Sequence, residues 1–201
     1  MRIATWNINS LRLRLPMLDK IVGQLKPDII CLQETKVPDE LFPAEGVAAL
    51  GFEHVVYRGM KSYNGVAILS KVPITELRRR NWCDKDDCRH IAVGLPDGTE
   101  LHDFYVPAGG DVPDPVENDK FAHKLAFIDE MESWFKKKKQ SKRILVGDLN
   151  IAPGEEDVWS HKQLVKVVSH TPVEVDGLNR VIDAHKWIDV ARHFIPADEK
   201  I

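Results

Sequence analysis

The stretch that decides the fold is residues 143–150, whose sequence is RILVGDLN. Its unbroken aliphatic run suits a buried central strand, and the run stops at a glycine that precedes an acid and an amide. Asp148 and Asn150 are two residues apart, so in an extended chain their side chains leave the strand on the same face. Taken alone, this pattern fits a metal or phosphate site, and it equally fits a strand followed by an Asx turn.

Two earlier stretches repeat this design. Residues 2–9 (RIATWNIN) form a strand pattern that ends in Asn7 and Asn9, and residues 28–36 (DIICLQETK) place a glutamine and Glu34 at a strand end. Ligand sites commonly lie at such ends, because the strands support them rigidly. Three strands that finish in carboxylates and carboxamides therefore predict one polar cleft.

Helices and hairpins separate these strands. Apolar residues recur at three- and four-residue steps over 11–25 and 121–135, which predicts two amphipathic helices. Further strands are predicted near 52–57, 65–69, 90–95 and 100–106. Pro96–Thr99 joins the last two, and its Asp-Gly step signals a tight hairpin. Strand pairs covered by helices indicate an α/β protein with two sheets and helices outside.

Composition places few further limits on the chain. Its 201 residues are 43% hydrophobic and show no repeat or linker, so we expect a single domain over 1–201. The net charge of −3 neither indicates nor excludes nucleic-acid binding. No membrane span or secretory signal is visible. The three cysteines, Cys31, Cys83 and Cys88, fit a reducing cytoplasm better than a disulfide framework. We expect a cytoplasmic protein with no membrane contact and no obligate protein partner.

Several other cysteine, histidine and basic residues could suggest binding sites, and most of them have a simpler structural interpretation. Cys83, Cys88 and His90 do not have the spacing of zinc ligands and are interpreted as a loop and a strand start. The four lysines of 136–139 suit the C-terminal end of a helix. Arg78–Arg80, expected in a loop near the predicted cleft, are better candidates for phosphate contact, as is Lys61.

Five motifs occur in a fixed order along the chain. They are TWNIN (5–9), LQETK (32–36), NGVAILS (64–70), YVP (105–107) and GDLN (147–150). Their order and spacing resemble the exonuclease III-type apurinic/apyrimidinic endonucleases of the endonuclease/exonuclease/phosphatase superfamily. The resemblance implies a DNase I-like, four-layered α/β sandwich in which helices flank two mainly antiparallel sheets.

The same resemblance implies residues that this sequence does not contain. Relatives carry two further acids and a C-terminal Ser-Asp-His pattern, which is absent here. We therefore expect 1–201 to be a C-terminally truncated endonuclease/exonuclease/phosphatase domain that lacks the last strands.

The resemblance also assigns roles around a divalent metal ion, Mg²⁺ or alternatively Mn²⁺. Glu34 is expected to bind the metal, with Asn7 orienting it, and Asp148 and Asn150 complete the metal's surroundings. Asp148 would activate the attacking water, and Asn150 would donate a hydrogen bond to the phosphate. Tyr105 would bind a phosphate oxygen or the carboxylates. The simpler alternatives are a surface acid at Glu34 and a core tyrosine at Tyr105.

Four residues are predicted to contact DNA. Arg89 falls where the family has an arginine that touches the DNA backbone, and its alternative is a surface ion pair. Asn64 could contact DNA or simply form an Asn-Gly turn. Asn9 and Lys36 are weaker candidates. Ala108 follows the Tyr-Val-Pro motif where many relatives have asparagine, so one polar contact is in doubt.

The predicted function is that of a magnesium-dependent DNA repair nuclease. Its expected partner is double-stranded DNA with abasic sites or 3′ ends, on which it would incise, trim 3′ ends or act as a 3′–5′ exonuclease. The superfamily also contains inositol-phosphate phosphatases, sphingomyelinases and secreted nucleases. The Gln-Glu-Thr-Lys form of the metal motif favours the bacterial repair branch. The alternative is a catalytically inactive, truncated DNA-binding remnant of such an enzyme.

Overall fold

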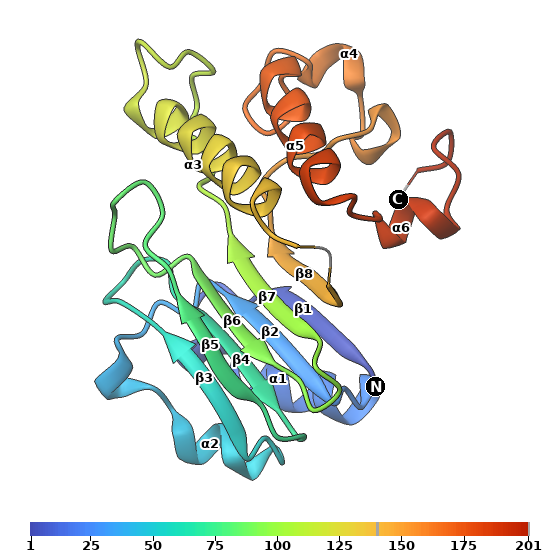
Figure 1. Cartoon of the computed structure of the whole chain (residues 1–201). Coiled ribbons are helices and arrows are strands. Elements are labelled where there is room, and N and C mark those ends of the chain that lie inside the picture. Colours follow the sequence, from blue (N-terminus) through green and yellow to red (C-terminus); the bar gives the residue numbers. More distant parts are fainter. Residues whose placement is uncertain (140, 201) are drawn as a thin grey trace. The chain divides into compact units, whose positions relative to one another are not determined.

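The computed structural model describes residues 1–139 and 141–200, which form two compact units (Figure 1). Unit 1 consists of residues 1–105 and 141–149 and holds all strands of the described residues. Unit 2 consists of residues 106–139 and 150–200 and holds helices α3 to α6. No helix in the described parts of the chain is long and apolar enough to cross a membrane.

Unit 1 contains two four-stranded sheets. The first is built from β1 (Ile3–Asn7), β2 (Ile29–Gln33), β3 (His54–Arg58) and β4 (Val66–Ser70), in the order β1-β2-β4-β3. The second is built from β5 (Thr75–Arg79), β6 (His90–Gly94), β7 (Glu100–Tyr105) and β8 (Arg143–Asp148), in sequence order. Only β1/β2 and β7/β8 pair in parallel. The prediction of two mainly antiparallel sheets is therefore confirmed.

The two parallel pairs set where the predicted site residues lie. In the first sheet Asn7 pairs with Gln33, so Glu34 follows directly beside the end of β1. In the second sheet Tyr105 pairs with Asp148, which is the last pair between β7 and β8. Because parallel strands end at the same edge of a sheet, each pair presents two polar residues together.

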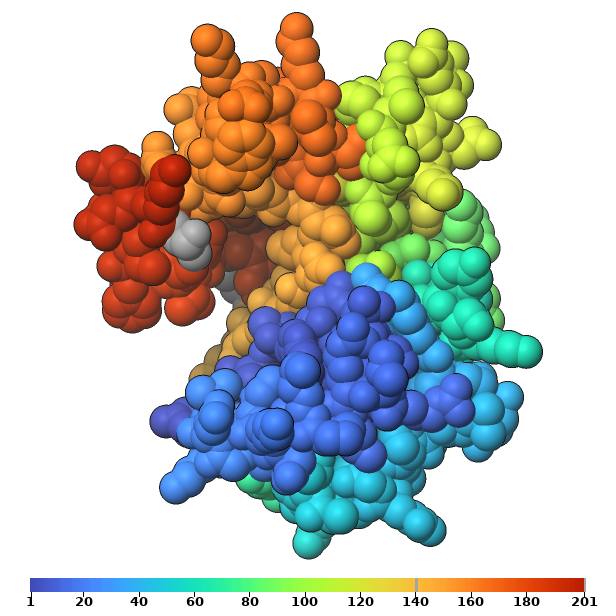
Figure 2. Space-filling model, turned by 180° about the vertical axis from the view of Figure 1, so that it is seen from behind, coloured from blue at the N-terminus to red at the C-terminus, as the bar shows by residue number. Residues whose placement is uncertain are grey.

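Apolar side chains of unit 1 form two clusters. One lies between the sheets and includes Ile29, Ile68, Ile91 and Leu101, all fully buried. The other lies under α1 (Leu11–Leu25) and α2 (Ala44–Ala49), which contribute the residues Leu11, Leu18 and Val47. Figure 2 shows the N-terminal part of the chain, in blue, forming the visible face of unit 1. Burial of such side chains at about 25 cal/mol per Å² is the main stabilising term of this sandwich.

The predicted hairpin is present between β6 and β7. Leu95 and Thr99 are joined by a backbone hydrogen bond of 2.8 Å, and Gly98 has a φ of 83° that suits glycine. A different expectation was wrong, because Arg78 and Arg79 lie in the exposed edge strand β5 and not in a loop. Alternating apolar residues are scarce in Thr75–Arg79, which is why the sequence pattern does not identify that strand.

Unit 2 is built around a pair of helices. The helix predicted over 121–135 is α3 (Asp119–Lys136), and it packs against α5 (Pro172–His185). The remaining short elements are α4 (His161–Leu164), α6 (Val190–Phe194) and the 3₁₀ turn Glu155–Asp157; unit 1 has a similar turn at Asp39–Leu41. Asn118 caps α3 by accepting a 3.0 Å hydrogen bond from the Lys120 backbone N–H.

Candidate active site

The strand ends of unit 1 carry left-handed backbone conformations, which are uncommon for Glu and Lys and more readily adopted by Asn. Glu34 has a φ of 55°, Lys36 a φ of 51° and Asn9 a φ of 45°. Left-handed conformations of non-glycine residues persist where surrounding contacts hold them, and they concentrate at functional sites. Here these residues follow β1 and β2 directly, where the sequence predicts the polar cleft.

The Glu34 carboxylate is the centre of a hydrogen-bonded cluster. Its Oε1 accepts from Asn7 Nδ2 at 2.9 Å and from the Tyr105 hydroxyl at 2.8 Å. Its Oε2 forms an ion pair with Lys36 Nζ at 2.8 Å, and Lys36 also donates to Asn9 Oδ1 at 2.6 Å. The structure thus brings five of the predicted residues into one connected group within unit 1.

Asn7 joins this group to the second acid. Its Nδ2 donates to Asp148 Oδ2 at 2.8 Å as well as to Glu34, so one amide group holds both carboxylates. The Asn7 Oδ1 in turn accepts from the Asn9 backbone N–H at 3.2 Å. Asn7 thus holds both carboxylates through its side chain, and its role beside a metal stays a prediction.

The hydrogen bonds of Glu34 and Tyr105 have opposite effects on their pKa values. Burial pushes the pKa of Glu34 upward, but the hydrogen bonds from Asn7, Lys36 and Tyr105 together hold it below its ordinary value. Burial and the neighbouring Glu34 carboxylate raise the pKa of Tyr105 well above its ordinary value. The site therefore keeps Glu34 ionised and Tyr105 protonated at neutral pH.

Arg89 is engaged with residues beside this cluster. It forms an ion pair with Asp87 at 2.5 Å, donates to the Tyr105 carbonyl at 3.2 Å and lies 4.8 Å from the Tyr105 ring centroid. Asn64 donates to the Asp87 carbonyl at 2.9 Å. Arg89 and Asn64 thus both support the loop around Asp87, and their contact with DNA stays a prediction.

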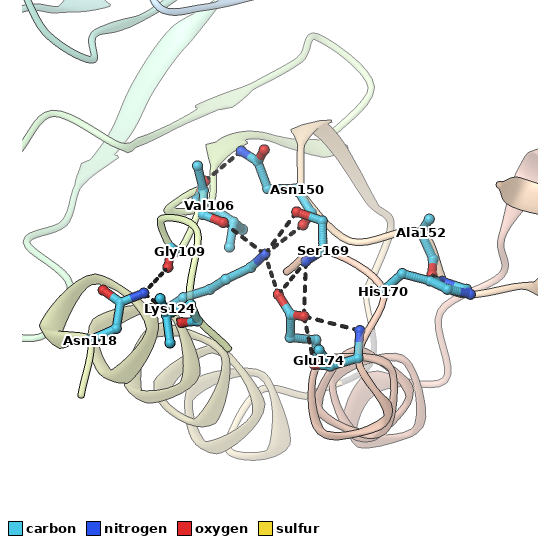
Figure 3. Close-up of polar contacts among 12 residues, drawn as sticks. Val106, Gly109, Asn118, Lys124, Asn150, Ala152, Ser169, His170 and Glu174 are labelled. Atoms are coloured by element: carbon cyan, nitrogen blue, oxygen red, sulfur yellow. Dashed lines mark hydrogen bonds and ion pairs between the residues drawn. The ribbon is translucent and has the colours of Figure 1, made fainter. Parts of the chain in front are cut away.

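Asn150 belongs to unit 2. Its φ is 52°, and its Nδ2 donates to the Val106 carbonyl at 2.9 Å. Its backbone carbonyl accepts from the buried Lys124 at 2.6 Å (Figure 3). The contacts of Asn150 within unit 2 therefore fix its conformation, while its role at the phosphate stays a prediction.

The sequence analysis missed a buried pair next to the cluster. Asp103 is fully buried, and its Oδ1 accepts from Gln33 Nε2 at 2.6 Å. Burial raises the pKa of Asp103 well above its ordinary value. Gln33 precedes Glu34, and Asp103 lies two residues before Tyr105, so the pair joins the strands that present both. The available signal was an acid between apolar and aromatic residues of a predicted strand, Leu101 and Phe104.

The donor set of this cluster suits a hard divalent cation. Glu34 and Asp148 supply carboxylate oxygens, and Asn7 binds both of them. Magnesium prefers oxygen ligands and keeps several waters, so one or two carboxylates suffice. No group of three or more His, Cys, Asp and Glu side chains arranged for a metal occurs in the described residues.

Comparison with known proteins places the chain in a family. Residues 4–177 match the model of the Endonuclease/Exonuclease/phosphatase family, and the chain belongs to that family. Exodeoxyribonuclease III of Haemophilus influenzae is 33% identical over 165 residues, which cover 79% of this chain and 60% of that protein. DNA repair nuclease APEX1 of Danio rerio is 28% identical over 92% of this chain and 60% of its own length. The chain thus spans about three fifths of these curated relatives.

Solved structures support the fold over the whole chain. An AP endonuclease from Archaeoglobus fulgidus is 30% identical, with a TM-score of 0.88, and the match covers 100% of this chain and 77% of that one. A Neisseria 3′ phosphatase bound to product DNA hairpin is 29% identical with a TM-score of 0.81, over 92% of this chain and 71% of that one. The predicted resemblance and DNase I-like fold are confirmed.

Proposed function

We propose that the protein is a divalent-metal-dependent DNA repair nuclease that hydrolyses phosphodiester bonds in duplex DNA. The observation that carries this proposal is the joining of Glu34 and Asp148 by the single amide group of Asn7. Relatives named as exodeoxyribonuclease III, DNA repair nuclease and AP endonuclease support the same chemistry. Abasic sites and 3′ ends are the proposed substrates.

The residues of the cluster divide the work of hydrolysis. Asp148 acts as general base and takes a proton from the attacking water, a role that requires hydrogen-bond reach and an ionised carboxylate. Tyr105 keeps its single hydroxyl proton, which it donates to Glu34 in the free site and can redirect to a phosphate oxygen as charge develops there. Asn150 is proposed to donate to the phosphate in the same way. Asn7 holds both acids in place.

Glu34 is the proposed metal ligand, with Asp148 beside it and Mg²⁺ or Mn²⁺ as the ion. When bound, such an ion neutralises phosphate charge and stabilises the leaving oxygen. Lys36 offsets the negative charge of Glu34, and Arg89, Asn64 and Asn9 are proposed to contact the DNA backbone. We also propose a cytoplasmic location, which fits the three free cysteines.

The test is cleavage of a duplex oligonucleotide with one abasic site by this chain in magnesium. Asp148→Asn preserves the shape of the side chain and removes the base, so we expect turnover to fall about 10²–10⁴-fold. Asp176→Asn, at an exposed position of α5, is the matched control and should leave turnover unchanged. EDTA should abolish cleavage.

The outcomes separate the two functions that the sequence suggests. Metal-dependent cleavage that is lost in Asp148→Asn supports the nuclease. DNA binding without cleavage by the folded chain would instead support the inactive DNA-binding remnant. Full activity of Asp148→Asn would refute the assignment of the general base.

A further inference from the structure

A buried ion pair lies at the centre of unit 2. Lys124 of α3 and Glu174 of α5 are both 0% exposed, and their charged atoms are 2.5 Å apart (Figure 3). Removing two charges from water is costly, and a pair of this kind is weak evidence for stability by itself. Stability alone therefore does not account for a buried ion pair at this position.

The contacts of the pair are with loops more than with the helices. Lys124 Nζ donates to the Asn150 carbonyl at 2.6 Å, to the Ala108 carbonyl at 3.2 Å and to Ser169 Oγ at 3.3 Å. The Glu174 carboxylate accepts from the Ser169 backbone N–H at 2.9 Å, and from the Thr171 hydroxyl at 2.6 Å. The pair thus joins three loops through their polar groups.

These loops enclose Asn150 from both sides. The Asn150 side chain donates to Val106, just before the Ala108 loop, while its carbonyl is held by Lys124. Two residues further on, the Ala152 backbone N–H donates to the Ser169 carbonyl at 2.8 Å. Asn150 has a φ of 52°, in the left-handed region that asparagine adopts more readily than most non-glycine residues, and these contacts hold it there.

We propose that the Lys124–Glu174 pair positions Asn150, so that Lys124 is a positioning residue for the phosphate-binding carboxamide. This inference rests on the proposed nuclease function, in which Asn150 donates to the phosphate. The pair acts through the Asn150 backbone and does not touch substrate. Its loss should lower kcat and leave KM nearly unchanged, since the carboxamide would be misdirected while the rest of the DNA contacts remain.

The test uses the double variant Lys124→Met/Glu174→Gln in the full chain. Methionine keeps the length of lysine, and glutamine keeps an oxygen for the Ser169 and Thr171 donors, so no unpaired charge is left in the core. Arg180→Met is the matched control. Arg180 also joins α5 to α3, through ion pairs of 2.6 Å to Asp129 and 2.9 Å to Glu132. Neither of these ion pairs involves a residue of the three loops.

We expect kcat to fall roughly 10- to 100-fold in the double variant and to stay unchanged in Arg180→Met. The same double variant made in an Asn150→Ala background should lose nothing further, because the pair acts only through Asn150. If the double variant instead lowers kcat by the same factor in the Asn150→Ala background as in the wild type, and lowers the melting temperature equally in both, the role of the pair is purely structural. That result would overturn the inference.

A second measurement does not depend on activity. The side-chain amide signals of Asn150, assigned by their loss in Asn150→Ala, should shift in the ¹⁵N–¹H spectrum of the double variant and not in Arg180→Met. Unshifted signals in a folded double variant would overturn the positioning role. An inactive wild-type protein would refute the proposed nuclease instead, and the spectra would still decide whether the pair positions Asn150.

Discussion

Two buried residues of β7, Tyr105 and Asp103, bear on protonation within unit 1. Tyr105 donates its hydroxyl hydrogen to Glu34 at 2.8 Å, and this bond is one of the three that lower the pKa of Glu34. Asp103 lies two residues earlier on β7, and burial raises its pKa, whereas the pKa of Glu34 is lowered. The two effects lead to two predictions at the scale of single residues.

Tyr105→Phe should move the acid limb of the pH–activity profile to higher pH. Loss of the hydroxyl lets the pKa of Glu34 rise, so Glu34 becomes protonated at a higher pH as the solution is acidified. The profile of kcat/KM against pH reports this group in the free enzyme. Tyr57→Phe on β3 is the control, because Tyr57 stacks on Phe42 at 3.8 Å outside the cluster. An unmoved acid limb in Tyr105→Phe would contradict the pKa assignment.

Asp103→Asn should stabilise the protein at neutral pH. The folded-state pKa of Asp103 is raised, so its contribution to stability is complete below the unfolded pKa of about 3.9 and is lost as pH rises toward the folded value. Asparagine has no proton to lose in this range, so the variant keeps its stability as the pH rises. Each unit of pKa shift corresponds to about 1.4 kcal/mol, or about 3–6 °C in a chain of this size.

Melting temperatures of Asp103→Asn and wild type from pH 4 to pH 9 test this expectation. The two curves should diverge as pH rises, and parallel curves would refute a neutral Asp103. Asp97→Asn is a useful contrast, since the backbone N–H of Thr99 lowers the pKa of exposed Asp97. That variant should lose stability relative to wild type above the acid range and converge with it on acidification.

At the scale of elements, the ends of β8 and β7 decide where the site residues lie. Gly147 precedes Asp148 and has a φ of 139°, and an added Cβ would lie 1.9 Å from the Phe104 carbonyl oxygen. Phe104 pairs with Gly147 in the parallel ladder, so the carbonyl cannot move without breaking the pairing. The glycine in the GDLN motif is therefore required by packing.

Gly147→Ala should destabilise the protein by about 3 kcal/mol or more, which combines backbone strain with the displaced carbonyl. Gly98→Ala in the hairpin turn is the matched control. Gly98 also has a positive φ, of 83°, but nothing lies within 4 Å of an added Cβ, so strain alone should cost about 1–2 kcal/mol. Urea denaturation measures both, and equal losses would contradict the steric argument.

At the scale of the whole molecule, metal binding at the proposed site should couple to folding. A ligand that binds only the folded chain raises stability by RT ln(1 + [L]/Kd). At a metal concentration of ten times Kd this is about 1.4 kcal/mol. For a chain of about 200 residues the melting temperature should rise by about 3–6 °C.

Thermal melts with increasing MgCl₂, and with MnCl₂, test this coupling. Glu34→Gln keeps the hydrogen-bonding shape and removes the ligand charge, so the rise should disappear. Matched additions of KCl to both proteins correct for ionic strength. A rise that persists in Glu34→Gln would place the metal elsewhere.

Much of the fold is readable from local patterns. Period-two alternation, aliphatic runs and the Asp-Gly turn depend on neighbours a few residues apart, so the sequence predicts β1, β2, β8, α1, α3 and the β6–β7 hairpin. Exposed β5 lacks that periodicity, and the sequence analysis did not predict α5. The five motifs also suffice to predict the family, which the comparisons confirm.

The sequence by itself determined which residue types end the strands and therefore which chemistry is available. Only the tertiary structure decided which of them meet: Asn7 bonds to Asp148, which is 141 residues away, and Gln33 bonds to Asp103 across 70. Lys124 and Glu174 likewise pair only because α3 packs on α5. Such contacts depend on strand order and packing between distant segments, and a buried polar group must find its partner there because water is excluded.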